Sequence, residues 1–243
     1  MGAVLTPAAL AAMIDHTFLK PDGPADAIAR LCDEALEWRF ACVMVNPCNV
    51  AEAARRVAGS DVRTGTVIGF PLGQSTLAAM RAEALDAIGN GADELDFVVN
   101  VRAVKAAAAA LGDASQCADS SALPLAADYR AMLDAVRAAK QVTTKLIIET
   151  CYLTDAEKVF ACRMAKAAGF DFVKTSTGFG TAGATVADVA LMRKTVGPEM
   201  GVKAAGGIRD LATALALVNA GANRLGCSSG VAIVTEGRAH EDH

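Results

Sequence analysis

Two lysines stand in apolar segments of the sequence, where an ammonium group is costly to bury. Lys174 lies in FVKTST and Lys203 in GVKAAGG, and both segments have the composition of a buried β-strand. If the two strands are neighbours in register, about 4.8 Å apart, their amino groups approach closely. Burial and a like charge both lower the pKa of a lysine, and a neutral amine can attack a carbonyl carbon. The pair therefore predicts covalent amine chemistry.

The alternative is that each lysine extends to solvent or pairs with a carboxylate. For a single lysine that alternative is the stronger interpretation. Two lysines at consecutive strand ends favour the catalytic one.

Acidic residues in similar settings are the candidate proton-transfer groups. Asp96 lies in the apolar segment DELDFVV, on the same strand face as Glu94 because side chains alternate along a strand. Its carboxylate could counter a lysine charge or move a proton, and a structural ion pair is an equally good explanation. Asp15, at the end of another short strand, is a similar candidate, with helix capping as its alternative.

Glycine-rich turns follow the last three predicted strands, in TSTGFG, AAGGIR and GCSSG. Backbone N–H groups in such turns converge on anions, and barrel enzymes often bind a substrate phosphate there. The predicted phosphate-binding residues are Gly178, Gly206, Gly207, Ser228 and Ser229. Tight turning alone would also explain the glycines, and helix capping would explain the serines.

The sequence predicts neither a metal site nor a cofactor. His16 is the one histidine outside the charged tail, and no HExxH or CxxC motif occurs. No dinucleotide-binding glycine fingerprint follows the first strand. The seven cysteines, an odd number without paired spacing, indicate free thiols in a reducing, cytoplasmic setting.

Short apolar strands alternate with amphipathic helices along the whole chain. The expected strands are 13–18, 40–46, 64–70, 93–99, 143–149, 170–175, 201–205 and 223–227. Eight such strands predict an α/β fold, a (β/α)8 TIM barrel formed as a single domain by residues 1–243. Thr6 followed by Pro7 predicts a short helix before the first strand.

Composition and charge exclude several classes of partner. The 243 residues carry a net charge of −4 without a basic cluster, which argues against nucleic acid or a membrane surface as partner. No segment has the length and hydropathy of a membrane span, and the first residues lack the features of a signal peptide. We expect a flexible insertion over 105–124, which is rich in alanine and serine, and a frayed tail over 237–243.

Six motifs together resemble deoxyribose-phosphate aldolase, a family of class I aldolases. They are IDHTFLKP, VIGFPLG, GADELDFVVN, FVKTSTGFG, VKAAGGIR and CSSGVAIV, and they occur in the family's order over most of the chain. The resemblance implies that Lys174 forms the Schiff base, that Lys203 lowers its pKa and handles protons, and that Asp96 is an acid/base residue. From its position in the sequence, Asp15 is a further candidate, as a proton relay.

The resemblance further implies metal-independent cleavage of 2-deoxy-D-ribose 5-phosphate to D-glyceraldehyde 3-phosphate and acetaldehyde, a step in deoxyribose phosphate catabolism, by a homo-oligomer (dimer or tetramer). Two alternative functions are equally compatible with the phosphate-binding glycines. They are a non-catalytic phosphosugar sensor and an isomerase that uses Asp96 as its base. Neither needs two strand-end lysines.

Overall fold

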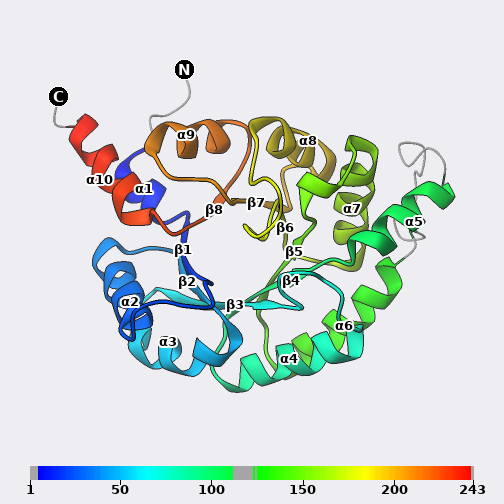
Figure 1. The fold of residues 1–243 in the computed structure, drawn as a ribbon, viewed down its shortest axis with the longest axis horizontal. Helices are drawn as coiled ribbons and strands as arrows, with labels where there is room; N and C mark the ends of the chain where they lie inside the picture. Colours follow the sequence, from blue (N-terminus) through cyan, green and yellow to red (C-terminus); the bar gives the residue numbers. More distant parts are fainter. Residues whose placement is uncertain (1–4, 112–122, 124, 242–243) are drawn as a thin grey trace.

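Eight parallel strands close into a barrel in the computed structural model, which describes residues 5–111, 123 and 125–241 (Figure 1). Each strand pairs with the next one along the chain, and β8 pairs back with β1. The strands are β1 (Ile14–Phe18), β2 (Cys42–Val45), β3 (Arg63–Ile68), β4 (Glu94–Val98), β5 (Thr143–Ile147), β6 (Phe172–Lys174), β7 (Gly201–Ala205) and β8 (Arg224–Cys227). The predicted (β/α)8 barrel is confirmed, and every predicted strand is present with ends shifted by at most a few residues.

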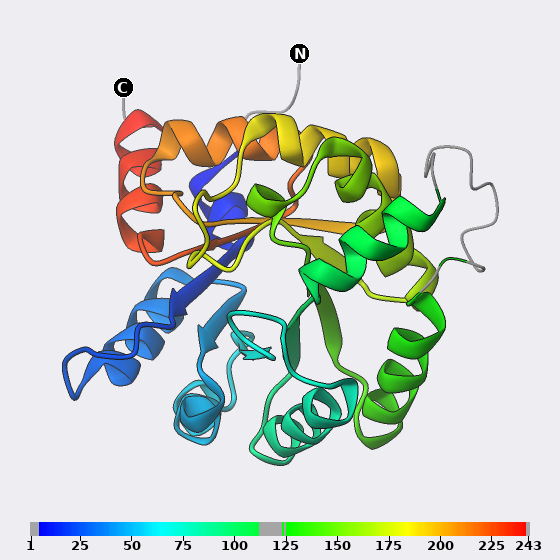
Figure 2. The same cartoon turned by 45° about the vertical axis from the view of Figure 1, so that its right-hand side comes forward.

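Helices surround the barrel (Figures 1 and 2). They are α1 (Pro7–Ala11), α2 (Ala27–Trp38), α3 (Val50–Val57), α4 (Leu77–Gly89), α5 (Val101–Leu111), α6 (Ala126–Ala139), α7 (Asp155–Ala168), α8 (Val186–Val196), α9 (Leu211–Asn219) and α10 (Gly230–Glu241), with 3-10 turns η1 (Pro47–Asn49) and η4 (Thr150–Tyr152). In both views the C-terminal helix α10 lies beside the N-terminal helix α1, and the two are in contact.

Local sequence signals set several helix ends. The Thr6 side chain accepts a hydrogen bond from the N–H of Ala9 at 3.2 Å, and Pro7 occupies the first turn, which confirms the predicted short helix before β1. Thr154 and Glu157 form a reciprocal capping box at the start of α7. These caps fix where each helix begins on the outside of the barrel.

The apolar residues form two separate clusters. The larger one fills the space between the outer faces of the strands and the helices. The smaller one lies on the side of β2 and β3 and consists of Leu19, Cys42, Met44 and Val67. Because side chains alternate along a strand, one residue set packs against the helices and the other points into the barrel. Buried charged residues of the other strands occupy the rest of the interior.

Both segments predicted to be irregular contain helix. The first residues of the predicted insertion, 105–111, belong to α5, while residues 112–122 and 124 lie outside the described part. The tail continues α10 as far as Glu241, and residues 242–243 lie outside the described part. Six cysteines in the described ranges are free thiols, as expected. Among the described helices, none is long and apolar enough to cross a membrane.

Candidate active site

A cavity of about 420 Å³ opens at the carboxyl ends of β1, β6, β7 and β8. Its lining includes Lys174 and all five residues predicted to bind phosphate: Gly178, Gly206, Gly207, Ser228 and Ser229. The structure therefore brings the predicted nucleophile and the predicted phosphate loops to one cavity. Asp15, Asp96 and Lys203 are fully buried inside the barrel and do not line this cavity.

The two predicted lysines are register partners on adjacent strands. Lys174 on β6 pairs with Lys203 on β7, which confirms the placement expected from the sequence. Lys174 is 3% exposed and Lys203 is 0% exposed. Neither ammonium group extends to solvent, so that part of the alternative is wrong, but both lysines do pair with a carboxylate, as its other part expected.

One carboxylate joins the two lysines. The Nζ atoms of Lys174 and Lys203 each lie 2.8 Å from the Oδ2 atom of Asp96, and both donate hydrogen bonds to it. Burial acts to raise the pKa of Asp96, but Lys145, Lys174 and Lys203 outweigh it and hold that pKa well below its usual range. Asp96 is therefore a buried carboxylate anion within reach of both amines.

The environment of Lys174 favours its neutral form. Burial is the largest effect and lowers the pKa of Lys174 to about 8, and the nearby charges of Lys203 and Lys145 act in the same direction. The Asp96 carboxylate opposes them by stabilising the ammonium form. A useful fraction of this lysine is thus a free amine near neutral pH, which is the requirement for attack on a carbonyl.

Asp15 lies inside the barrel on β1 and contacts Lys203. Its Oδ2 atom accepts a hydrogen bond from Lys203, and its Oδ1 atom lies 2.9 Å from the Nε atom of Arg224. Burial would raise the pKa of Asp15, but Lys203, Arg224 and Lys145 lower it. The helix-capping alternative for Asp15 is wrong, because the residue sits within a strand and its carboxylate faces cations.

Two cations of this cluster were not predicted from the sequence. Lys145 on β5 is 0% exposed, and its Nζ atom donates to the Oδ1 atom of Asp96 at 2.9 Å and to Glu94. Arg224 at the start of β8 also donates to Glu94. The signal for Lys145 was present, since TTKLIIE is another apolar strand with a lysine inside it.

The charges inside the barrel do not balance if every group is ionised. The cluster has four basic side chains (Lys145, Lys174, Lys203, Arg224) and three acidic ones (Asp15, Glu94, Asp96) within the described residues. Unpaired charge in a dry interior is expensive. Losing one proton from Lys174 gives three charges of each sign, and Lys174 is the lysine whose pKa is lowered.

The loops at the cavity mouth contain glycines in the left-handed backbone region. Gly178, Gly206 and Gly207 have φ of 89°, 86° and 80°, a region that disfavours other residues. The loops after β6 and β7 also approach closely, because a Cβ on Gly183 would lie 2.2 Å from the carbonyl oxygen of Gly206. Ser228 and Ser229 directly precede α10, so the positive end of that helix faces the same region.

Three further residues line or brace the cavity and were not among the residues predicted from the sequence to bind phosphate. Lys20 and Arg209, both exposed, line the cavity and add positive charge at its mouth. The buried carboxylate of Glu149 accepts hydrogen bonds from the N–H and the hydroxyl of Thr177, which braces the loop after β6. Glu149 itself has a φ of 56°, a strained conformation for a non-glycine residue.

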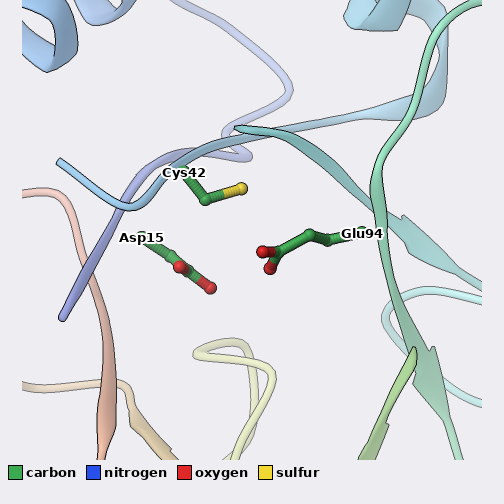
Figure 3. A group of neighbouring side chains, drawn as sticks. All are labelled: Asp15, Cys42 and Glu94. Carbon is green, nitrogen blue, oxygen red and sulfur yellow. The ribbon is translucent and has the colours of Figure 1, made fainter. Parts of the chain in front are cut away.

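Asp15, Cys42 and Glu94 form the one group in the described chain whose ligand atoms are close enough to hold a metal ion (Figure 3). The two carboxylates are already paired with lysines and Arg224. Burial, Glu94 and Asp15 raise the pKa of Cys42 well above its usual range, which keeps the thiol protonated. The donor set therefore suits cations of the protein itself rather than a metal ion.

Comparisons with known proteins identify the family of this chain. The model of the DeoC/LacD family aldolases matches residues 9–236. The chain is 53% identical over 225 residues to deoxyribose-phosphate aldolase of Bacteroides thetaiotaomicron, covering 93% of this chain and 89% of that protein. It is 51% identical to the Clostridium perfringens enzyme, covering 92% and 93% of the two chains. The deoxyribose phosphate aldolase structure from Aeropyrum pernix superposes with a TM-score of 0.83 at 29% identity, covering 97% and 93%. The chain belongs to the deoxyribose-phosphate aldolases of the DeoC/LacD family.

Proposed function

We propose that this protein cleaves 2-deoxy-D-ribose 5-phosphate reversibly to D-glyceraldehyde 3-phosphate and acetaldehyde, through an imine on Lys174. The single observation that carries the proposal is the placement of Lys174. It is a buried lysine with a pKa of about 8, and it lines the cavity formed by the glycine and serine loops. A phosphosugar sensor has no use for such an amine, and an isomerase with Asp96 as base has no need of a lowered lysine pKa.

The amine of Lys174 adds to the aldehyde carbon of the open-chain sugar, and loss of water gives a protonated imine. The positive imine nitrogen accepts the electron pair when the bond between C2 and C3 breaks, while the C3 hydroxyl loses its proton and becomes the new aldehyde. The remaining enamine takes up a proton at its terminal carbon. Water then hydrolyses the imine, which releases acetaldehyde and restores the amine.

Asp96 and Lys203 are proposed to move the protons of these steps. Asp96 accepts a hydrogen bond from Lys174, and Lys203 donates a hydrogen bond to Asp96. Asp15 contacts Lys203 and not Lys174, so its proposed relay role acts through Lys203. Proton transfer by positioned groups of this kind commonly contributes about 10²- to 10⁴-fold to a rate.

The loops at the cavity mouth are proposed to hold the phosphate of the substrate. Gly178, Gly206 and Gly207 present backbone to the cavity, and Ser228 and Ser229 add hydroxyl groups at the start of α10. Binding a group remote from the reacting carbons converts affinity into correct placement over Lys174.

The assembly and location of the protein are further proposals. The Aeropyrum pernix relative is described as tetrameric, and on this likeness we propose a homo-oligomer, a dimer or tetramer. The free cysteines of the described chain support a reducing compartment, in keeping with a cytoplasmic enzyme.

The first prediction tests the imine. Borohydride added with acetaldehyde should fix a two-carbon adduct on Lys174 of the wild-type protein, located by peptide mass mapping. Lys174→Met should abolish both this adduct and turnover, because no other lysine lines the cavity at the strand ends except the exposed Lys20. An adduct on Lys203, with trapping that persists in Lys174→Met, would reverse the roles proposed here.

The second prediction concerns Lys203, whose charge helps to lower the pKa of Lys174. In Lys203→Leu that pKa should rise, and each unit of rise leaves roughly tenfold less free amine near pH 7. Turnover should therefore be low at neutral pH and recover in part as pH increases. A flat pH profile in a folded variant would show that Lys203 acts by proton transfer alone.

The third prediction separates phosphate binding from loop structure. Ser229→Asp places a negative charge where the phosphate is proposed to bind, so turnover of deoxyribose 5-phosphate should fall far more than turnover of deoxyribose. Ser229→Ala is the matched control and should cause a smaller loss. Equal losses on both substrates in Ser229→Asp would show that this residue shapes the loop and does not contact the phosphate.

The fourth prediction concerns metal removal. Because the carboxylates near Cys42 are paired with lysines and Arg224, activity should survive exhaustive EDTA treatment. Lost activity that zinc restores would contradict the imine mechanism and point to metal-assisted enolate chemistry.

A further inference from the structure

Lys145 is a buried lysine that the mechanism above does not use. It lies on β5 as the register partner of Asp96 on β4, and its side chain is 0% exposed. It does not line the cavity over Lys174, so it does not meet the substrate. A fully buried lysine is rare unless its partners require it, and the partners of Lys145 are the carboxylates of the site.

The contacts of Asp96 divide between its two oxygen atoms. Lys174 and Lys203 donate to Oδ2 at 2.8 Å, whereas Lys145 donates to Oδ1 at 2.9 Å. The terminal torsion of an aspartate is soft, so the orientation of its carboxylate is set by its partners. Lys145 is the partner that holds Oδ1 and thereby leaves Oδ2 for the two lysines nearer the cavity.

Lys145 is also the cation that leaves the interior one positive charge in excess. Without it, Lys174, Lys203 and Arg224 would match Asp15, Glu94 and Asp96 charge for charge, with Lys174 fully protonated. With it, balance is reached only when one lysine loses its proton. The most exposed lysine of the three, Lys174, is the one that faces the cavity.

We propose that Lys145 is a positioning residue for the imine reaction: it fixes the Asp96 carboxylate through Oδ1 and supplies the extra buried cation that shifts Lys174 toward its neutral form. The inference rests on the proposed imine role of Lys174. Glu94 takes part in the same charge balance, because it contacts Lys145 and Arg224 and offsets part of their positive charge.

The titratable and charged groups that face this cluster come from several strands of the barrel. In the described chain they are Asp15 of β1, Cys42 of β2, Glu94 and Asp96 of β4, Lys174 of β6, Lys203 of β7 and Arg224 of β8. Burial would lower the pKa of Lys145, but Asp96, Glu94 and Asp15 outweigh it and hold this pKa well above its usual range. Lys145 therefore stays charged throughout the pH range in which Lys174 titrates.

The test is the pH dependence of borohydride trapping of acetaldehyde on the full-length protein, read as adduct mass on Lys174. Four proteins are compared: wild type, Lys145→Met, Glu94→Gln and the double variant. Lys145→Met keeps most of the length of the side chain and removes its charge. The double variant removes one charge of each sign, so it restores the excess of one cation. Circular dichroism and the thermal midpoint confirm that each protein is folded.

The wild-type curve reports the titration of Lys174. In Lys145→Met the midpoint should move up by about one pH unit or more, with roughly tenfold or greater loss of trapping rate at pH 7. In Glu94→Gln the midpoint should move down, because Lys145 is then less compensated. In the double variant the midpoint should return toward the wild-type value, which a simple packing defect at Lys145 would not produce.

Three results would overturn the inference: an unchanged midpoint in folded Lys145→Met, a double variant as impaired as Lys145→Met, or an unchanged or raised midpoint in Glu94→Gln. If Lys145→Met does not fold, Glu94→Gln alone tests the inference, since it leaves Lys145 in place. Absence of any adduct on Lys174 of the wild-type protein would instead overturn the imine role itself, and the two failures are therefore distinguishable.

Discussion

The interior of this barrel depends on one carboxylate shared by three lysines. Asp96 is fully buried, and each of its oxygen atoms accepts at least one hydrogen bond from an ammonium or amine group. Alone, a buried carboxylate costs several kcal/mol, and so does each buried lysine. Their mutual attraction offsets most of that cost but not all of it, because the interior holds one basic group more than it has acids. The proton that costs least free energy to remove is the one on Lys174, whose pKa is lowered. A neutral Lys174 is the form that attacks the carbonyl carbon.

The strands have to leave room for this cluster. Lys203 passes directly over Gly226 on β8, where a Cβ would lie 2.9 Å from the Cε atom of the lysine. Lys203 cannot easily move aside, because Asp15 and Asp96 hold its Nζ atom. Gly226 is therefore needed for space rather than for an unusual backbone angle. The apolar half of the interior, around Met44 and Val67, fills the volume that the charged half leaves.

Much of this organisation could be predicted from the sequence. Alternating strands and helices predicted the barrel, and two lysines at the ends of consecutive strands predicted the register pair. In a closed barrel, strands that are consecutive in the chain lie side by side. The residue type and the position in the sequence were therefore enough to predict that Lys174 and Lys203 pair. Gly178, Gly206 and Gly207 were likewise placed at the cavity by the rule that loops follow the carboxyl ends of strands.

What could not be predicted depends on the depth of each side chain in the barrel. Lys145 carries the same signal as Lys174, a lysine within an apolar strand, yet it lies deeper, opposite Phe172 of β6, while Lys174 is opposite Ile147 of β5. That difference comes from the stagger between strands, which a single sequence does not show. The contact between Asp15 and Lys203 also requires the barrel to close, because β1 and β7 are not adjacent.

Depth separates two tasks that one site must perform. The phosphate loops lie at the mouth, where Ser228, Lys20 and Arg209 are exposed and a charged ligand can exchange water for backbone N–H groups at little cost. The ionic cluster lies below, where water is excluded and a single proton changes the energy of the interior substantially. Lys174 is the one member of the cluster that reaches both regions. Because Lys174 is the group of the buried network that loses a proton, the reactive amine lies at the surface of the cavity. Substrate bound at the mouth can then reach this amine without opening the interior to solvent.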